Sequence, residues 1–299
     1  MEVLVARSAG FCMGVRRAID IARQVARQEG RVVYTHGPLI HNPQELERLR
    51  GEGIMPVTEG ADIPRAPVIV RAHGIPPEER RRLDEQAERV VDATCPNVAK
   101  IQETISEYGS RGYAVVIAGD ADHPEVVGLR GHARGPAFVV ARPGEVDDLP
   151  PLDRVLLVTQ TTLDTRVFEE IRERVLARFP GAEALSTICR STHRRQSETR
   201  ELARRVDAMV VIGGRNSANT RRLVDICEGL GTPAYHVETA RELPLGELAR
   251  CRRMGVTAGA STPSWIIREV VEALSRLAGA RQPRRGSPTG PSGAGRGGG

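Results

Sequence analysis

One pattern occurs three times along the chain, and it restricts the folds that the chain can adopt. In each copy a cysteine opens a helix-like stretch, and 24 or 25 residues later a glycine ends a short apolar run. The cysteine–glycine pairs are Cys12 with Gly37, Cys95 with Gly119, and Cys189 with Gly213. Each copy continues with a second helix-like stretch and a second apolar run. The sequence therefore predicts three copies of one α/β unit.

The apolar runs are rich in β-branched residues, as in VVYTHG, YAVVIAGD and AMVVIGG. Short runs of this kind that alternate with helices indicate parallel sheets with crossover helices. The runs end in Gly, Thr or His, which suit loops at the carboxyl ends of strands, where open α/β sheets bind ligands. We expect an α/β fold whose ligand site lies at those strand ends.

The repeat and the composition of the end of the chain predict the domain boundaries. The first unit is expected over 14–95, the second over 96–188, and the third over 1–13 together with 189–278. The last fourteen residues contain seven glycines and no large apolar side chain. Such a composition cannot form a core, so a disordered Gly/Pro/Arg tail is expected over 279–299.

Three equivalent cysteines would lie together around a pseudo-threefold axis. At Cys95 we expect Thr94 to cap the helix, Pro96 to occupy its first turn, and the helix N-terminus to lower the pKa of the thiol. Gaps of 82 and 93 residues between the three cysteines do not fit a zinc finger. A cubic iron–sulfur cluster takes one thiolate per iron, so three cysteines would leave one iron open to substrate. Cys227 and Cys251 have no counterpart in the other copies and are expected to be structural.

Composition restricts the compartment and the partners. Five cysteines spread along the chain indicate a reducing compartment. There is no signal peptide and no apolar run of about 18 residues, so we expect a cytoplasmic protein without a membrane contact. The net charge of +5 depends on four arginines after residue 279, and aromatic residues make up 3% of the chain, too few for base stacking. Nucleic-acid binding is therefore not expected.

The strand-end loops supply polar groups that suit a phosphate or diphosphate. Histidines, hydroxyls and amides beside glycine-rich backbone bind such groups through neutral donors and imidazolium. The candidates are His36, His41, His73, His123, Thr159, Gln160, Thr161, Thr162, Ser217, Asn219, Thr220 and Ser261. Glu125 is the carboxylate beside these histidines, and it can supply a proton if burial raises its pKa. His132, His193 and His236 are expected to be structural.

Nine motifs together identify a family resemblance. They are GFCMGVRRAI, GPLIHNPQ, RAHG, DATCPNV, HPEVVGLRG, TQTTL, STICRSTHRRQ, GGRNSANTRRL and GVTAGASTP. From about Val3 to Leu277 the chain resembles the 4-hydroxy-3-methylbut-2-enyl diphosphate reductases of the methylerythritol phosphate isoprenoid pathway. The resemblance implies a trefoil of three small α/β units around a pseudo-threefold axis and a central [4Fe-4S] iron–sulfur cluster.

The resemblance also implies a role for each candidate residue. The cluster ligands would be Cys12, Cys95 and Cys189. The diphosphate contacts would be His41, His73, Ser217, Asn219 and Ser261. His123 would line the same pocket, and Glu125 with Thr161 would form the proton relay to the leaving hydroxyl. The implied reaction is a two-electron reductive dehydroxylation that gives isopentenyl and dimethylallyl diphosphate, with ferredoxin or flavodoxin as electron donor.

Three departures and one alternative accompany this interpretation. After Cys189 the segment RSTHRRQ is more basic than the common pattern, with Thr192 kept. Ala218 stands where many relatives have a second serine, so one phosphate contact is expected to be missing or made by backbone. The Gly/Pro tail replaces the C-terminal segment of many relatives. The alternative is a non-catalytic iron–sulfur or Cys/His regulatory paralogue on the same fold. Retention of Glu125 and Thr161 favours the enzyme, and both nucleotide-binding fingerprints, GxGxxG and GxxxxGK[ST], are missing from the sequence.

Overall fold

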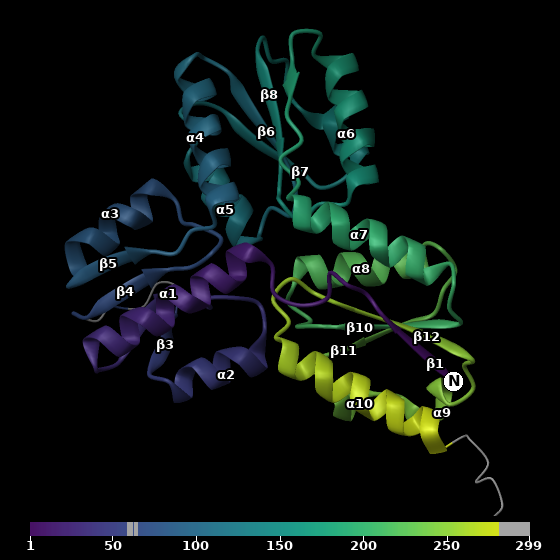
Figure 1. Ribbon diagram of the computed structural model, residues 1–299. Helices are drawn as coiled ribbons and strands as arrows, with labels where there is room; N and C mark the ends of the chain where they lie inside the picture. Colours follow the sequence, from purple (N-terminus) through teal and green to yellow (C-terminus); the bar gives the residue numbers. More distant parts are fainter. Residues whose placement is uncertain (59–61, 63–64, 281–299) are drawn as a thin grey trace, which may run out of the picture.

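The computed structural model describes residues 1–58, 62 and 65–280. Within them the strands form three sheets of four strands, and neighbouring strands are parallel throughout. Figure 1 shows three lobes, each built on one sheet, around a common centre. The predicted α/β trefoil with parallel sheets is confirmed.

The three sheets have equivalent strand orders. The first has the order β3-β2-β4-β5 and contains β2 (Val33–His36), β3 (Ile54–Val57), β4 (Pro67–Val70) and β5 (Arg89–Asp92). The second has the order β7-β6-β8-β9 and contains β6 (Ala114–Ala118), β7 (Ala137–Val140), β8 (Val155–Thr159) and β9 (Glu183–Ala184). The third has the order β11-β10-β12-β1 and contains β1 (Glu2–Val5), β10 (Ala208–Ile212), β11 (Ala234–Val237) and β12 (Arg253–Ala258). The N-terminal strand β1 therefore takes the edge position that β5 and β9 hold in the other sheets.

Helices cover both faces of each sheet in the same arrangement. One face packs against the cysteine-led helix and the helix after it, which are α1 (Met13–Glu29) with α2 (Pro43–Gly51), α4 (Pro96–Ser110) with α5 (Pro124–Gly131), and α7 (Arg190–Ala203) with α8 (Ala218–Glu228). The other face packs against α3 (Pro77–Gln86), α6 (Thr165–Arg178) or α10 (Ser264–Ala280). Short helical turns complete the fold, namely η1 (Pro143–Asp148), η2 (Ala240–Glu242) and α9 (Leu245–Leu248).

Burial on both faces explains why the central strands read as continuous apolar runs. In β8, Leu156 packs toward α4 and α5, while its neighbour Leu157 packs toward α6, and both are fully buried. Successive strand residues point to opposite faces, so a strand covered on both faces needs an apolar residue at every position. Each such side chain contributes about 1.5–3 kcal/mol through burial.

The predicted domain boundaries remain predictions, although the three sheets occupy separate parts of the chain. At the C-terminal end, α10 continues to Ala280 and so includes the first two residues of the expected tail. A single glycine such as Gly279 costs a helix only about 1 kcal/mol relative to alanine, which allows this extension. The rest of the expected tail, residues 281–299, lies outside the described residues. None of the described helices is long and apolar enough to cross a membrane.

Candidate active site

Each of the three repeated cysteines is the N-cap of the helix that follows it. Its backbone N–H donates to a carbonyl two residues beyond the end of a strand in the preceding lobe. These bonds run from Cys12 to Ala260 (3.0 Å), from Cys95 to Ala72 (2.9 Å) and from Cys189 to Thr161 (3.1 Å). The same bond in three copies fixes the three cysteines in equivalent places where one lobe passes into the next.

Two expectations about Cys95 are wrong. Cys95, and not Thr94, is the N-cap of α4, although Pro96 occupies the first turn as expected. Burial raises the pKa of the Cys95 thiol and outweighs the hydrogen bonds from the backbone of Asn97 and Val98, which lower it. The sequence shows the helix start but not the degree of burial, and burial disfavours the thiolate.

The three thiols line one cavity. A Cβ atom added to Gly14, in the first turn of α1, would lie 2.6 Å from Cys95 Sγ and 4.0 Å from Cys12 Sγ. The side-chain amide of Asn97 donates to Cys189 Sγ at 3.2 Å. Three soft sulfur donors therefore face a common space that the glycine leaves open, and this donor set fits an iron–sulfur cluster.

The other two cysteines do not line this cavity. Cys227 is fully buried between α8 and the third sheet, and burial raises the pKa of its thiol to about 12. Cys251 packs against the apolar core on the opposite face of that sheet. Both placements agree with the expected structural role.

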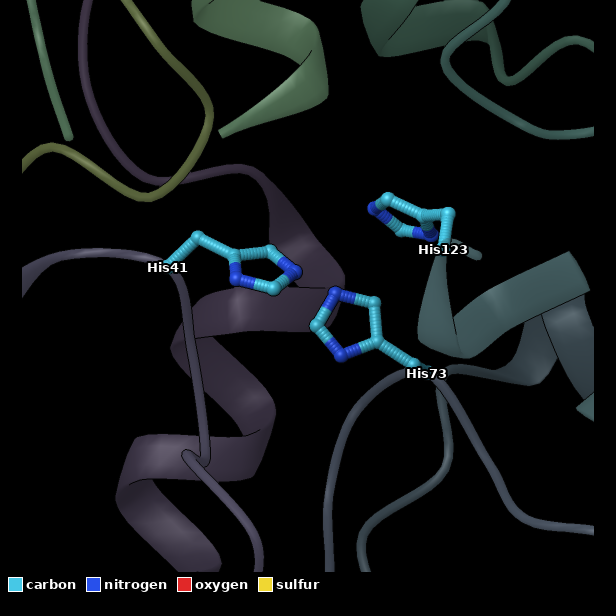
Figure 2. Close-up of side chains that lie close together, drawn as sticks. All are labelled: His41, His73 and His123. Carbon is cyan, nitrogen blue, oxygen red and sulfur yellow. The ribbon is translucent and has the colours of Figure 1, made fainter. Parts of the chain in front are cut away.

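Three histidines from separate loops form a cluster in the same cavity (Figure 2). The ring centroids of His41 and His73 are 4.6 Å apart, and His123 lies 5.3 and 5.4 Å from them. Burial lowers the pKa of His41 to about 4 and that of His123 to about 3, and it lowers the pKa of His73 well below 6.5. The positive charge of Arg71 adds to the effect on all three. Without a bound anion, these lowered pKa values favour neutral rings at neutral pH over the expected imidazolium.

The hydrogen bonds of these histidines define how the neutral rings can bind a ligand. The backbone N–H of Glu125 donates to Nδ1 of His123 at 3.1 Å, so the proton of the neutral ring must be on Nε2. His41 Nε2 and His73 Nδ1 are buried without a hydrogen-bond partner among the described residues. Buried polar atoms are normally paired, so these nitrogens indicate a ligand site.

The third lobe contributes groups at the N-terminus of α8. Ser217 caps this helix, and its Oγ accepts from the N–H of Thr220 at 3.3 Å. Both polar atoms of the Asn219 side chain are buried and unpaired among the described residues. Ser261 Oγ donates to the carbonyl of His41 at 3.0 Å and so joins the third lobe to the first. A helix N-terminus with free donors is a binding site for anions.

The second lobe contributes a buried carboxyl group. Glu125, only 2% exposed, accepts from the N–H of Thr161 at 2.6 Å and from its Oγ1 at 2.7 Å. Burial raises the pKa of Glu125, although both bonds from Thr161 act in the opposite direction. A carboxyl group that holds its proton more tightly than usual is suited to act as a general acid.

Every residue to which the resemblance gives a role lines this one cavity, and so does Thr162. The other strand-end candidates do not line it, namely His36, Thr159, Gln160 and Thr220. The individual roles of the lining residues remain predictions. The histidines expected to be structural lie elsewhere: His132 bonds to the carbonyl of Gly128, His236 bonds to that of Gly213, and His193 is exposed.

The protein family described as LytB protein matches residues 3–275. The chain belongs to this family. Curated relatives named 4-hydroxy-3-methylbut-2-enyl diphosphate reductase include those of Geobacter sulfurreducens, 43% identical over 93% of this chain and 98% of the relative, and of Opitutus terrae, 44% identical over 93% and 100%. A solved structure of (E)-4-hydroxy-3-methyl-but-2-enyl diphosphate reductase is 38% identical, with a TM-score of 0.67 over 92% of this chain and 100% of that one. The Plasmodium falciparum reductase is 27% identical, with a TM-score of 0.87 over 91% and 87%.

Two residues near the site of this LytB-family chain were missed in the sequence. Gly14 opens the space beside two cysteines, and Arg195, 2% exposed, joins α7 to the loop before Cys12. Alignment of the repeat could have found Arg195, because the positions six residues after Cys12 and Cys95 are apolar.

Proposed function

We propose that this chain is a 4-hydroxy-3-methylbut-2-enyl diphosphate reductase, which forms isopentenyl and dimethylallyl diphosphate. The observation that carries the proposal is that one cavity contains three cysteines, a cluster of neutral histidines and a buried Glu125–Thr161 pair. Relatives with this name cover nearly the whole chain, which supports the same activity here. The reaction uses two electrons and two protons: one proton leaves in water and the other ends on carbon.

Cys12, Cys95 and Cys189 would hold a [4Fe-4S] cluster. When bound, the cluster supplies single electrons and a Lewis-acidic iron with an open position. Ferredoxin or flavodoxin would deliver the electrons. Gly14 supports this assignment, since its missing Cβ leaves room beside two of the thiols.

The diphosphate would be bound by His41, His73, Ser217, Asn219 and Ser261. The unpaired ring nitrogens and the unpaired amide of Asn219 can donate to phosphate oxygens without net charge. The N-terminus of α8 adds backbone donors and a favourable dipole, so Ala218 can contribute through its N–H.

Glu125 and Thr161 would deliver the proton to the leaving hydroxyl group. A protonated Glu125 can donate through Oε2 to Thr161 Oγ1, 2.7 Å away, while Thr161 donates onward to the substrate. His123 would orient the same hydroxyl through its Nε2–H.

The decisive experiment combines metal analysis with an anaerobic assay. Protein purified without oxygen should contain iron and sulfide near four per chain, the content of a [4Fe-4S] cluster. It should convert 4-hydroxy-3-methylbut-2-enyl diphosphate with a chemical reductant. A loaded cluster without turnover would instead support the non-catalytic regulatory paralogue, which the buried Glu125–Thr161 pair disfavours.

Two further expectations remain part of this proposal. We propose the domain division 14–95, 96–188, and 1–13 with 189–278, and a cytoplasmic location for the enzyme. Limited proteolysis of the loaded protein tests the first, since cleavage should concentrate near the boundaries of the lobes.

A further inference from the structure

The side chain of Arg195, in the first half of α7, donates to three backbone carbonyls. One guanidinium nitrogen donates to the carbonyls of Ser8 and Ala258, the latter at 2.8 Å, and the other donates to the carbonyl of Gly10 at 3.0 Å. Gly10 lies two residues before Cys12, and Cys189 is the N-cap of the helix that carries Arg195. A single side chain therefore connects the segments of two of the three cysteines.

Arg195 binds the longest of the three segments that connect a strand to one of the repeated cysteines. Two residues separate β5 from Cys95, and four separate β9 from Cys189, whereas six separate β1 from Cys12. Glu198, one turn further along α7, accepts from the backbone N–H groups of Arg7 and Ser8 at 2.6 and 2.8 Å. A longer loop has more conformations to lose, so external bonds are needed to fix its end.

Only one of the three copies of the repeat has an arginine at this position. The positions six residues after Cys12 and Cys95 are Ala18 and Ile101, which are buried and apolar. Arg195 at the equivalent position is equally buried, with 2% exposed. Packing alone therefore does not explain the choice of an arginine.

Within the described part of the chain no carboxylate forms an ion pair with Arg195, although the charge of Glu198 favours its charged form. Its Nε is buried and lacks a hydrogen-bond partner among the same residues. Burial lowers the pKa of the guanidinium, while the negative charges of Cys12, Glu198 and Cys189 raise it. A buried cation is costly unless an opposite charge compensates it, and the thiolates of a metal centre would do so.

We propose that Arg195 is a positioning residue for the metal centre, which fixes Cys12 relative to Cys189 and stabilises the reduced cluster by its positive charge. The inference rests on the cluster of the proposed function. It predicts two separable effects. Loss of the guanidinium hydrogen bonds should make the bond between Cys12 and iron easier to break. Loss of the positive charge should make the midpoint potential of the cluster more negative.

The test uses two variants of the anaerobically reconstituted protein and one control. Arg195→Met removes both the donors and the charge, whereas Arg195→Lys keeps the charge but loses the fork geometry. Arg194→Met is the control, because Arg194 is the exposed neighbour on the same helix. The measurements are iron and sulfide content, the rate of cluster loss to a chelator, and the midpoint potential by redox titration.

We expect Arg195→Met to lose iron several-fold faster than the unaltered protein and to have a more negative midpoint potential. Arg195→Lys should lose iron faster at a nearly unchanged potential, and Arg194→Met should match the unaltered protein. Equal rates and potentials in all proteins would overturn the proposal. If Arg195→Met is insoluble, an unchanged chelation rate in Arg195→Lys would overturn the positioning role. Absence of a cluster from the unaltered protein would instead refute the proposed function.

Discussion

Glu125 is the residue whose chemistry follows most directly from its surroundings. Glutamine has nearly the same shape and still accepts a hydrogen bond from Thr161, but it has no acidic proton. Glu125→Gln should therefore fold, keep its iron and bind pyrophosphate normally, while turnover falls by roughly 10² to 10⁴. Steady-state assays under anaerobic conditions with a chemical reductant measure the loss.

Asp122→Asn is the matched control for this change, because Asp122 is an exposed acid three residues earlier in the chain. It should change turnover by less than about twofold, since exposed substitutions rarely matter. Near-normal turnover of Glu125→Gln would remove the proton relay from the mechanism and leave the cluster assignment untouched.

The cysteines allow a comparison within one chain. Serine oxygen is a poor ligand for iron in sulfur clusters, so replacing Cys12, Cys95 or Cys189 by Ser should each prevent a stable cluster. Cys227→Ser should keep full iron content, with some loss of stability because it places a hydroxyl in an apolar core. Iron retention by Cys12→Ser together with iron loss from Cys227→Ser would contradict the ligand assignment.

Gly14 supplies a test of the space between the thiols. In Gly14→Ala the new methyl group would overlap Cys95 Sγ, 2.6 Å away, and displace it. We expect most of the iron to be lost while the apo protein melts at a similar temperature, since alanine favours the helix. Gly144→Ala, where nothing lies within 4 Å, is the control. Equal iron content in both variants would show that the thiols move freely.

At the scale of elements, helix caps connect stability with the site. Asn42 is fully buried, caps α2 and accepts from the N–H of Glu45 at 2.9 Å, directly after His41. Asn42→Ala should lower the free energy of unfolding by about 1 kcal/mol and weaken pyrophosphate binding, because the cap fixes the end of the His41 loop. Denaturant unfolding and calorimetric titration measure the two effects.

The exposed Asn216 offers a comparison for stability. Asn216→Ala should unfold within about 0.5 kcal/mol of the unaltered protein, as surface changes usually do. An Asn42→Ala variant as stable as this one would show that α2 does not depend on its cap.

The elements that the sequence predicted best are those whose causes are local. A cysteine followed by a helical pattern and a β-branched run predicted α1, α4 and α7 with the strands after them, because periodicity reflects which faces are buried. The sequence also named polar residues that line the cavity, since their loops follow the ends of strands, while their roles stay predictions. The identity of the cap at Cys95 was missed, because Thr94 and Cys95 are adjacent and either fits the pattern.

What the sequence did not reveal depends on contacts between distant segments. The bond from Arg195 to Gly10 spans 185 positions, and no local pattern predicts it. The neutral state of His41 and His123 follows from burial among three lobes, which one-dimensional spacing cannot measure.

For the whole molecule, the histidine cluster predicts how stability depends on pH. His41, His73 and His123 have lowered pKa values, so below pH 6.5 the unfolded chain binds protons that the folded protein does not. Stability should rise with pH from about 5 to 6.5, with about 1.4 kcal/mol per pH unit for each such histidine near pH 5 and about half of that near pH 6.5. Glu125, whose raised pKa keeps a proton in the folded state, opposes this trend above pH 4.5.

Denaturant unfolding of the apo protein at several pH values measures the slope. His123→Asn should make it shallower, whereas His193→Asn, at an exposed position, should leave it unchanged. Identical slopes for His123→Asn and the unaltered protein would mean that His123 has the same pKa in the folded and unfolded states.

The edge position of β1 has a consequence for how the protein is made. Glu2 pairs with Arg253, and the N–H of Cys12 bonds to Ala260, so β1 is synthesised about 250 residues before the strand with which it pairs. The first two lobes can fold during translation, since their sheets are built from consecutive stretches of chain. The third lobe cannot, and until it forms Cys12 caps α1 but lacks the bond from its N–H to Ala260. Iron delivery to this protein is therefore expected to follow translation, and a chain interrupted before residue 253 should emerge as two folded lobes with a free N-terminal strand and no metal.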